Sequence, residues 1–241
     1  MIEKDTLTIY ENDMFKHYIF TRWNKINAEL DLYNNPDIPD KEAWMDHRVY
    51  LFEKYCLPAM YAQTCKNFTW LLSFAKQTPR WYIKRYVDIP FVQVIYDYPR
   101  DYINRLYADG DLQNGQWLIT SRLDNDDYYE PRFIETVQAQ FKKQFLLVDT
   151  DGRQLEVATR KFYDTARWSP NSPFISLIEQ VGTPWNSPQQ PYYDSPVRTV
   201  YYCSHSNMLL HFPAVRIDEP LYVMVIHDRN CSNHIVGKEI K

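Results

Sequence analysis

The feature that most constrains the fold is an apolar, β-prone run that ends in a cluster of carboxylates. Residues 117–123 read WLITSRL, and Asp124, Asn125, Asp126 and Asp127 follow directly. Open α/β sheets bind their ligands outside the carboxyl ends of their strands. Clustered carboxylate oxygens suit hard divalent cations, which commonly take substrate phosphates as further ligands. The sequence therefore predicts a site for a metal-bound nucleoside diphosphate at this strand end.

Two other interpretations of the acidic cluster stay open at this point. One is an acidic surface turn without a ligand, because an Asp-x-Asp pattern occurs often by chance. The other is a calcium loop, which can be tested by counting. A twelve-residue loop starting at Asp124 has Tyr129 at position six, where glycine is needed, and it contains Pro131. The pattern thus argues against the calcium loop.

Strands and helices are expected to alternate through the first part of the chain. Hydrophobic spacing, caps and prolines predict strands at 18–23, 68–74 and 91–96, and helices at 40–55, 58–64 and 78–86. Asp40 and Thr78 are the expected N-caps, and Pro58 the expected break between two helices. Such alternation is typical of a mostly parallel sheet.

The pattern changes after a helix that starts at Pro131. We expect a β-hairpin over 145–162 with its turn at 149–152, a helix from Ser172-Pro173 to Gly182, and a lid-like loop at 183–196. Short strands are expected at 197–203, 208–212 and 221–226. The fold class is therefore α/β: one domain over 1–241, with a mostly parallel nucleotide-binding half (about 18–127) and a mixed acceptor-side half (about 128–241).

Composition limits the class of protein. A chain of 241 residues and 29.1 kDa buries one substantial core, and 45% hydrophobic residues exclude a disordered protein. The formal charge of -4 argues against a large nucleic-acid footprint. Without an 18-residue apolar run, and with a polar N-terminus, a cytoplasmic protein with no transmembrane segment is expected. The four cysteines show no CxxC spacing, so zinc is not expected.

Several segments together resemble a known family. They are residues 20–24 (FTRWN), 44–52 with Arg48, 68–72 (FTWLL), 120–127 (TSRLDNDD), 173–179 (PFISLIE) and 226–230 (IHDRN). Over roughly 18–237 the chain is similar to the family named "Putative rhamnosyl transferase", and its plan is that of a GT-A-type glycosyltransferase. The resemblance implies sugar transfer from a nucleoside diphosphate donor to an acceptor hydroxyl, and the family's name points to rhamnose as the sugar.

One departure from the family pattern bears on the donor. Family members tend to carry an acidic residue just after the strand of Trp70, where the nucleobase is read, whereas this chain has Ala75 and Lys76. A dTDP- or UDP-linked sugar is the expected donor. The acceptor stays open: a saccharide, another hydroxyl compound or a modified nucleic-acid base.

The candidate metal ligands are Asp126, Asp124 and His227, for Mn or Mg. Asp124 is shared between metal and ribose, and His227 follows a late apolar run from which it can reach the cluster. The alternative for His227 is a hydrogen-bonded structural role; His205 and His234 are weaker candidates of the same kind. Removing the Asp126 carboxylate from a solvent-rich surface is expected to cost little stability.

Other side chains have alternative roles. Arg22 and Arg122 are candidate nucleotide contacts, and Arg122 is equally suited to a plain salt bridge with Asp124. Asp127 is a candidate metal neighbour or the cap of the following helix.

The resemblance implies that Glu179, in the expected acceptor-side helix, is the base that deprotonates the acceptor. The alternative is that Glu179 points away from the apolar face of this helix and is a solvated carboxylate without a catalytic role. Asp164 and Asp194 are the fallback bases. The expected mechanism is an inverting single displacement. The rival functions are a metal-dependent nuclease or phosphohydrolase, and a non-catalytic carbohydrate- or calcium-binding module.

Overall fold

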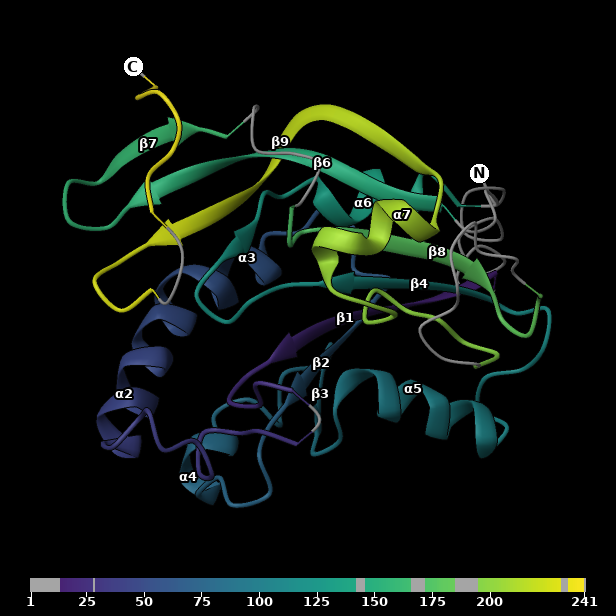
Figure 1. Cartoon of the computed structure of the whole chain (residues 1–241), viewed down its shortest axis with the longest axis horizontal. Helices are drawn as coiled ribbons and strands as arrows, with labels where there is room; N and C mark the ends of the chain where they lie inside the picture. The colour runs from purple at the N-terminus through teal and green to yellow at the C-terminus, as the bar shows by residue number, and fades with distance from the viewer. Residues whose placement is uncertain are drawn as a thin grey trace, which may run out of the picture.

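A computed structural model describes residues 14–27, 29–141, 146–165, 172–184, 195–230 and 234–240. In these residues the strands form one sheet in the order β3-β2-β1-β4-β8-β6-β9-β5, and β7 pairs with β6 off this path (Figure 1). The strands are β1 Phe15–Arg22, β2 Thr69–Ser73, β3 Val92–Ile95, β4 Trp117–Arg122, β5 Tyr128–Tyr129, β6 Leu146–Glu156, β7 Lys161–Asp164, β8 Ser176–Gln180 and β9 Ala214–Ile226.

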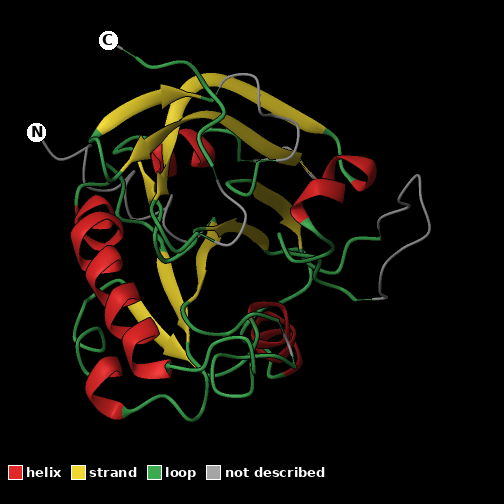
Figure 2. Cartoon of the chain, turned by 60° about the vertical axis from the view of Figure 1, so that its left-hand side comes forward, coloured by secondary structure: helices red, strands yellow, loops and turns green. Residues whose placement is uncertain are grey.

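Helices flank this sheet (Figure 2). They are α2 Lys41–Leu51, the π-helical segment η1 Phe52–Cys56, α3 Leu57–Tyr61, α4 Arg80–Ile83, α5 Pro99–Ala108, α6 Phe133–Gln138, the 3₁₀ turn η2 His205–Asn207 and α7 Met208–His211. Within the described ranges, none of these helices is long and apolar enough to cross a bilayer.

The first half of the sheet is parallel, as the sequence predicts. β1 pairs in parallel with both β2 and β4, and β2 pairs in parallel with β3. The carboxyl ends of β1 and β4 therefore lie side by side at one edge of the sheet. This edge carries Arg22 and Arg122, the last residues of the two strands.

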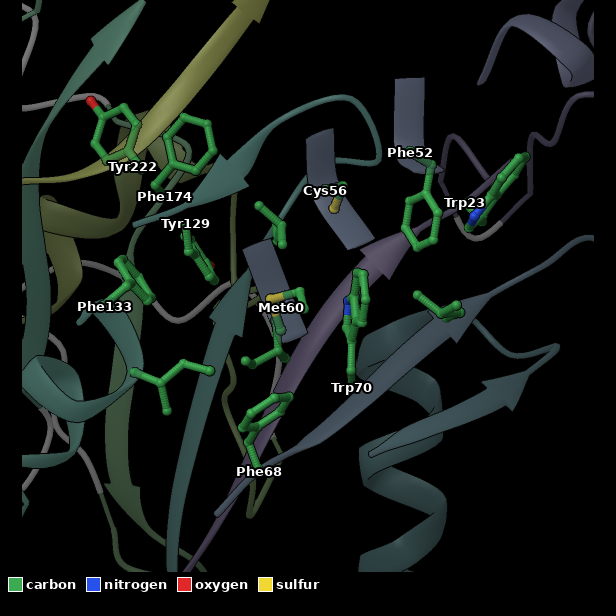
Figure 3. Packing of buried hydrophobic residues seen from close by; sticks show 14 of the residues in the cluster. Trp23, Phe52, Cys56, Met60, Phe68, Trp70, Tyr129, Phe133, Phe174 and Tyr222 are labelled. Carbon is green, nitrogen blue, oxygen red and sulfur yellow. The ribbon is translucent and has the colours of Figure 1, made fainter. Parts of the chain in front are cut away.

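Buried side chains alternate between the two faces of the sheet, because successive strand residues point in opposite directions. Ile19 and Ile119 belong to one core, which α2, α3 and α6 cover, whereas Phe20 and Leu118 belong to the other core, beneath α5 and α7. Residues of the first core pack as aromatic pairs (Figure 3). Phe52 stacks on Trp70 at 5.1 Å, Tyr129 on Phe133 at 3.5 Å and Phe174 on Tyr222 at 4.0 Å between ring centroids.

The second half is mixed, also as predicted, but its elements differ from the expected ones. β8 pairs antiparallel with β4 and β6, and β6 pairs in parallel with β9. The expected turn at 149–152 is wrong, because β6 runs straight through it and the hairpin is formed by β6 and β7. Gly152 serves packing instead: a Cβ there would meet the Tyr222 ring at 2.2 Å.

The expected helix at 172–182 is wrong as well. Residues 176–180 form β8 between β4 and β6, where Leu177 and Ile178 enter opposite cores. A short apolar run does not by itself distinguish a buried strand from a helix. For the same reason the strand expected at 208–212 is the helix α7, and the strand expected at 197–203 contains turns. Most of the lid-like loop expected at 183–196 lies outside the described residues.

Of the three expected caps and breaks, the structure confirms one. Asp40 caps α2 by accepting a hydrogen bond from Ala43 N at 2.9 Å, as predicted. Pro58 does not break the helix, because the chain widens into η1 before it, and Leu57 N donates to Phe52 O. Thr78 does not cap α4; its hydroxyl donates to Ala75 O at 2.7 Å.

Candidate functional site

The acidic turn after β4 is held against the end of β1 by hydrogen bonds. Leu123 N donates to Phe20 O at 2.9 Å, and Thr21 Oγ1 donates to Leu123 O at 2.8 Å. Asn125 Nδ2 donates to Trp23 O at 2.6 Å. These contacts fix Asp124 and Asp126 at the carboxyl edge of the sheet, which is where the sequence places the site.

Asp124 is bound by the arginine two residues before it. Arg122 Nη2 lies 3.2 Å from Oδ1 and 3.0 Å from Oδ2 of Asp124, and Arg122 Nε lies 3.4 Å from Oδ1. Burial opposes ionisation of Asp124, but the charges of Arg122 and Arg22 lower the pKa of this carboxyl below its ordinary value. Asp124 is therefore a carboxylate whose charge Arg122 already balances.

Asp126 is bound by residues from two distant elements. Its Oδ2 accepts hydrogen bonds from Arg48 of α2 and, at 3.0 Å, from His227 Nε2 after β9. Its side chain is only 10% exposed, as is that of Arg48. Asp126 thus joins α2, the acidic turn and the end of β9, and forms a nearly buried ion pair.

His227 lies at the acidic cluster, as the sequence predicts, but its ring nitrogens are both occupied. Arg229 N donates to His227 Nδ1 at 3.1 Å, so the proton of the neutral ring lies on Nε2 and is donated to Asp126. This geometry favours the structural alternative for His227. It also weighs against a second cluster, His47, His227 and Asp228, whose ligand atoms lie within 4.8 Å of one another.

Asp127 does not cap the following helix, so that expectation is wrong. Its Oδ1 accepts a hydrogen bond from Val225 N of β9 at 2.7 Å, and no side chain caps α6. Burial raises the pKa of Asp127 well above its ordinary value, and the neighbouring Asp126 and Asp124 raise it further. Asp127 therefore connects the acidic turn to β9.

A pocket of about 290 Å³ opens beside the acidic turn. We call it the acidic pocket; the lining residues that matter here are Arg22, Trp23, Trp44, Arg48, Asp124 and Asp126. The Arg48 guanidinium lies 5.2 Å from the centre of the Trp44 ring. The structure thus brings together Arg22, Asp124 and Asp126 at one pocket, and Arg122 and His227 contact its carboxylates.

Glu179 is not brought to this pocket. It is a fully buried residue of β8 and pairs with Leu118, four positions before Arg122, which corresponds to roughly 13 Å along the strand. Its carboxylate accepts hydrogen bonds from Thr199 N at 2.9 Å and Arg198 N at 3.0 Å. Burial raises the pKa of Glu179 to about 6 although these hydrogen bonds oppose the shift. The expectation of an off-core position on a helix is wrong.

The fallback residues lie elsewhere. Asp164 is in β7 opposite Arg153, away from both the acidic turn and its pocket, and Asp194 lies outside the described residues. His205 accepts a hydrogen bond at Nδ1 from Arg122 Nη1 at 3.0 Å, and burial beside Arg122 lowers its pKa to about 4. His234 offers its backbone carbonyl to Gln154 Nε2 at 2.8 Å.

Two residues that organise the site lie in segments that carry the family resemblance, but the sequence predicted no role for either. Asn24 Oδ1 accepts from Ala75 N at 2.7 Å, and Asn24 Nδ2 donates to Thr78 Oγ1 at 2.8 Å, so Asn24 holds the segment after β2. Arg48 is the other. A buried arginine needs an anion, so an arginine among the buried positions of α2 was the available signal for a partner carboxylate.

A model of the protein family described as "Putative rhamnosyl transferase" matches residues 32–239. The chain belongs to this family. The match includes the acidic turn, Arg48 and His227, whereas Arg22 and the rest of β1 precede it. The family assignment made from the sequence is thus confirmed, and with it the coarse assignment to the glycosyltransferases.

Solved structures of TarS from S. aureus, residues 1–349, are similar at low identity. The complex with UDP-GlcNAc has a TM-score of 0.48 and 11% identity, covering 92% of this chain and 62% of that one. The complex with UDP has a TM-score of 0.44 and 12% identity, covering 88% and 61%. This chain thus spans about three fifths of those TarS chains. Comparison with the curated proteins gave no match.

Proposed function

We propose that this protein transfers a sugar from a nucleoside diphosphate donor to an acceptor hydroxyl at the acidic pocket. One observation carries the proposal: the part of the chain that matches the family contains the acidic turn, and this turn borders a pocket at the carboxyl edge of a parallel sheet. Ligands of open α/β sheets bind at this edge.

The side chains at the edge divide into two roles. Arg22, which lines the acidic pocket, and Arg122, which is paired with the pocket residue Asp124, are two cations proposed to bind the donor phosphates. Asp124 and Asp126 offer hard oxygen ligands, which suit Mn or Mg, and Asp124 is also within the pocket where a ribose hydroxyl would need an acceptor. His227 holds Asp126 in place from the end of β9.

We expect Asp124 and Asp126 to bind a divalent cation only together with the nucleotide-sugar donor. The two carboxylates are already paired with two arginines, Asp124 with Arg122 and Asp126 with Arg48, so the pocket has little net negative charge to attract a cation. A diphosphate supplies that charge and gives Arg122 an alternative anionic partner. We therefore expect Mn or Mg to bind with the nucleotide and not before it.

The proposed reaction is a single displacement that inverts the anomeric carbon. The acceptor oxygen forms a bond to this carbon while the bond to the diphosphate oxygen breaks, and the hydroxyl proton leaves to a base. Arg22 and Arg122 stabilise the negative charge that develops on the diphosphate, and a bound cation would add Lewis-acid stabilisation. Because Glu179 is buried away from the pocket, the proposal does not use it as the base.

The donor is proposed to be a dTDP- or UDP-linked sugar, with rhamnose suggested by the family. The acidic residue expected to read the base is replaced by Ala75, which is buried, and by Lys76, which is exposed. Ala75 N already donates to Asn24 Oδ1 at 2.7 Å, so this N–H is not available to a nucleobase.

Thermal-shift and calorimetric titrations test the proposal. UDP, dTDP and GDP would each be titrated with and without Mn into the wild type, Asp124→Asn and Asp218→Asn. Asp218→Asn is the matched control, because its side chain is 85% exposed and lies outside the acidic pocket. We expect Mn-dependent binding of UDP or dTDP that Asp124→Asn weakens and Asp218→Asn retains.

Two results would contradict the proposal. If the wild type binds none of the nucleoside diphosphates, the proposed donor is wrong. If Mn binds equally tightly without nucleotide, the proposed coupling between Mn and nucleotide binding is wrong. Once a donor is found, NMR of the product's anomeric configuration tests inversion.

A further inference from the structure

A second cavity, of about 400 Å³, lies across the Arg122–Asp124 ion pair from the acidic pocket. We call it the arginine pocket. It is lined by the ends of β1 and β4, the first turn of α5 and the segment 200–205. Its polar lining includes Arg22, Tyr98, Arg100, Arg122, Tyr201 and His205. Arg22 lines both pockets. Two cavities therefore share one wall at the proposed reaction site.

The arginine pocket is basic. Three arginines line it, and no carboxylate does among the residues the structure describes there. Arg22 donates from Nη1 to Ile26 O, but its Nε is buried without a hydrogen-bond acceptor. A buried guanidinium N–H without an acceptor is unusual in a folded protein and calls for a missing anion.

Tyr201 supplies a second unsatisfied donor. Its side chain is 8% exposed, and its hydroxyl is buried without a partner although Tyr201 lines the cavity. The Arg22 guanidinium lies 5.7 Å from the centre of its ring. Burial raises the pKa of Tyr201 to about 12, so the hydroxyl stays protonated at neutral pH and can donate a hydrogen bond to a bound anion.

The first turn of α5 adds a third feature. Tyr98, the N-cap, and Arg100 line the cavity, and no side chain caps this ten-residue helix. The N-terminus of a helix carries partial positive charge and attracts anions. An arginine, a phenol and a helix terminus thus converge on one cavity, each suited to an anionic oxygen.

Hydrogen bonds from residues 198–200, just before Tyr201, hold this segment against β8 and β4 of the sheet. Glu179 of β8 accepts hydrogen bonds from Arg198 N and Thr199 N, and Thr120 Oγ1 of β4 accepts one from Val200 N at 3.0 Å. Thr199 has φ 62°, a conformation that a β-branched residue adopts only when its surroundings impose it. Glu179 is thereby a positioning residue for the wall of the arginine pocket.

We propose that the arginine pocket is the acceptor subsite and binds a phosphate group carried by the acceptor. The inference rests on the proposed function. The lining residues of the two pockets agree with these roles. The acidic pocket holds the carboxylates suited to a cation and a nucleotide, whereas Tyr201 and His205 of the arginine pocket come from the second half of the chain. Arg122 and Arg100 are paired with Asp124 and Asp101, so the donors without partners here are Arg22 Nε and the Tyr201 hydroxyl. The oxygens of a phosphate can accept from both donors and from the first turn of α5, whereas a carboxylate offers only two oxygens.

The test uses inorganic phosphate as the probe and acetate as the carboxylate comparison. Affinity would be measured by ³¹P NMR and thermal shift in the wild type, Tyr201→Phe and Tyr86→Phe. Tyr86 is the matched control, because its hydroxyl is also buried without a partner but lies outside the arginine pocket. We expect Tyr201→Phe to weaken phosphate binding roughly tenfold or more, since it removes a hydrogen bond to a charged group, and Tyr86→Phe to leave it unchanged.

A second arm separates the acceptor from the donor. Phosphate binding would be repeated at saturating Mn and UDP or dTDP, and we expect it to persist, with nucleotide affinity unchanged in Tyr201→Phe. Competition between phosphate and nucleotide would overturn the proposal and assign the arginine pocket to the donor diphosphate. Equal binding of acetate would overturn the choice of phosphate, and no phosphate binding at all would reject the site whatever the nucleotide does. Phosphate binding through Tyr201 without any nucleotide binding would reject the proposed function and the acceptor role together.

Discussion

Replacing Asp126 by alanine tests whether the acidic turn is built around a buried ion pair. The side chains of Asp126 and Arg48 are each 10% exposed, and Asp126 also accepts from His227. In Asp126→Ala the Arg48 guanidinium keeps only a contact of 3.3 Å to Asn125 Oδ1 from the cluster. Leaving a buried charge without its partner costs about 3–5 kcal/mol. The structure therefore corrects the expectation that this carboxylate can be removed at little cost.

That loss is large against the stability of a typical domain, which is about 5–15 kcal/mol. For a chain of this size it corresponds to a fall in Tm on the order of 10 °C. Urea unfolding at pH 7, followed by far-UV circular dichroism, measures the change in unfolding free energy. Asp218→Ala is the control: its carboxylate is 85% exposed and pairs with Arg216, so its removal should cost under about 1 kcal/mol.

A double variant separates stability from binding. Asp126→Leu with Arg48→Met removes both charges and should recover most of the lost stability, because a hydrophobic pair can replace a buried ion pair. Nucleotide binding with Mn should not recover. A loss below about 1 kcal/mol in Asp126→Ala would refute the reasoning, because it would show that Arg48 finds water or another anion.

The remaining predictions concern other places in the fold. Because the folded protein holds the Glu179 proton more tightly (pKa about 6 against an ordinary 4.5), stability should rise by about 2 kcal/mol in total as pH falls from well above 6 to well below 4.5. Urea titrations should show that Glu179→Gln lacks this rise. Turnover should fall no more than a few-fold, because the amide oxygen of glutamine can still accept the hydrogen bond from Thr199 N and keep the pocket wall in place; a loss of 10²–10⁴ with unchanged phosphate binding would restore Glu179 as the base. Gly152→Ala should lose about 1–3 kcal/mol, because its Cβ meets the Tyr222 ring; an unchanged Tm would contradict this packing. Arg160 has φ 60°, so Arg160→Gly should raise the unfolding free energy by up to ~1 kcal/mol, and a fall would show that the Arg160 side chain contributes more than its strain.

The parallel half of the fold was predictable because its signals are local. Asp40 caps α2, and the apolar runs ending at Arg22 and Arg122 have the length and composition of buried strands. The helix α5 was not anticipated although Pro99 occupies its first turn. Its buried residues Pro99, Tyr102, Ile103 and Leu106 keep the helical spacing i, i+3, i+4 and i+7, so the sequence did contain the signal for this helix.

The second half was predicted less well because its elements depend on tertiary contacts. Taken alone, Ser172-Pro173 and Gly182 are good helix boundaries. The residues between them nevertheless form β8, which pairs with β4 on one side and β6 on the other and is buried on both faces. Burial on both sides favours a strand there regardless of the flanking signals. Gly152 was misinterpreted for a related reason, since a glycine marks either a turn or a close approach, and only the position of Tyr222 decides between them.

The same limit applies to the charges of the site. The sequence shows three carboxylates within four residues, which suggests a strong cation site. In the fold, Arg122 balances Asp124 and Arg48 balances Asp126, and burial raises the pKa of Asp127 well above its ordinary value. A cation approaching this turn alone therefore meets neutralised ligands, whereas a cation that arrives with a diphosphate brings the missing charge and frees Asp124 by giving Arg122 a new anion. In this scheme Arg122, at the wall between the two pockets, responds to the donor on one side and faces the proposed acceptor phosphate on the other. The proposed order of binding, nucleotide together with cation, thus follows from the arginine partners and not from the number of carboxylates.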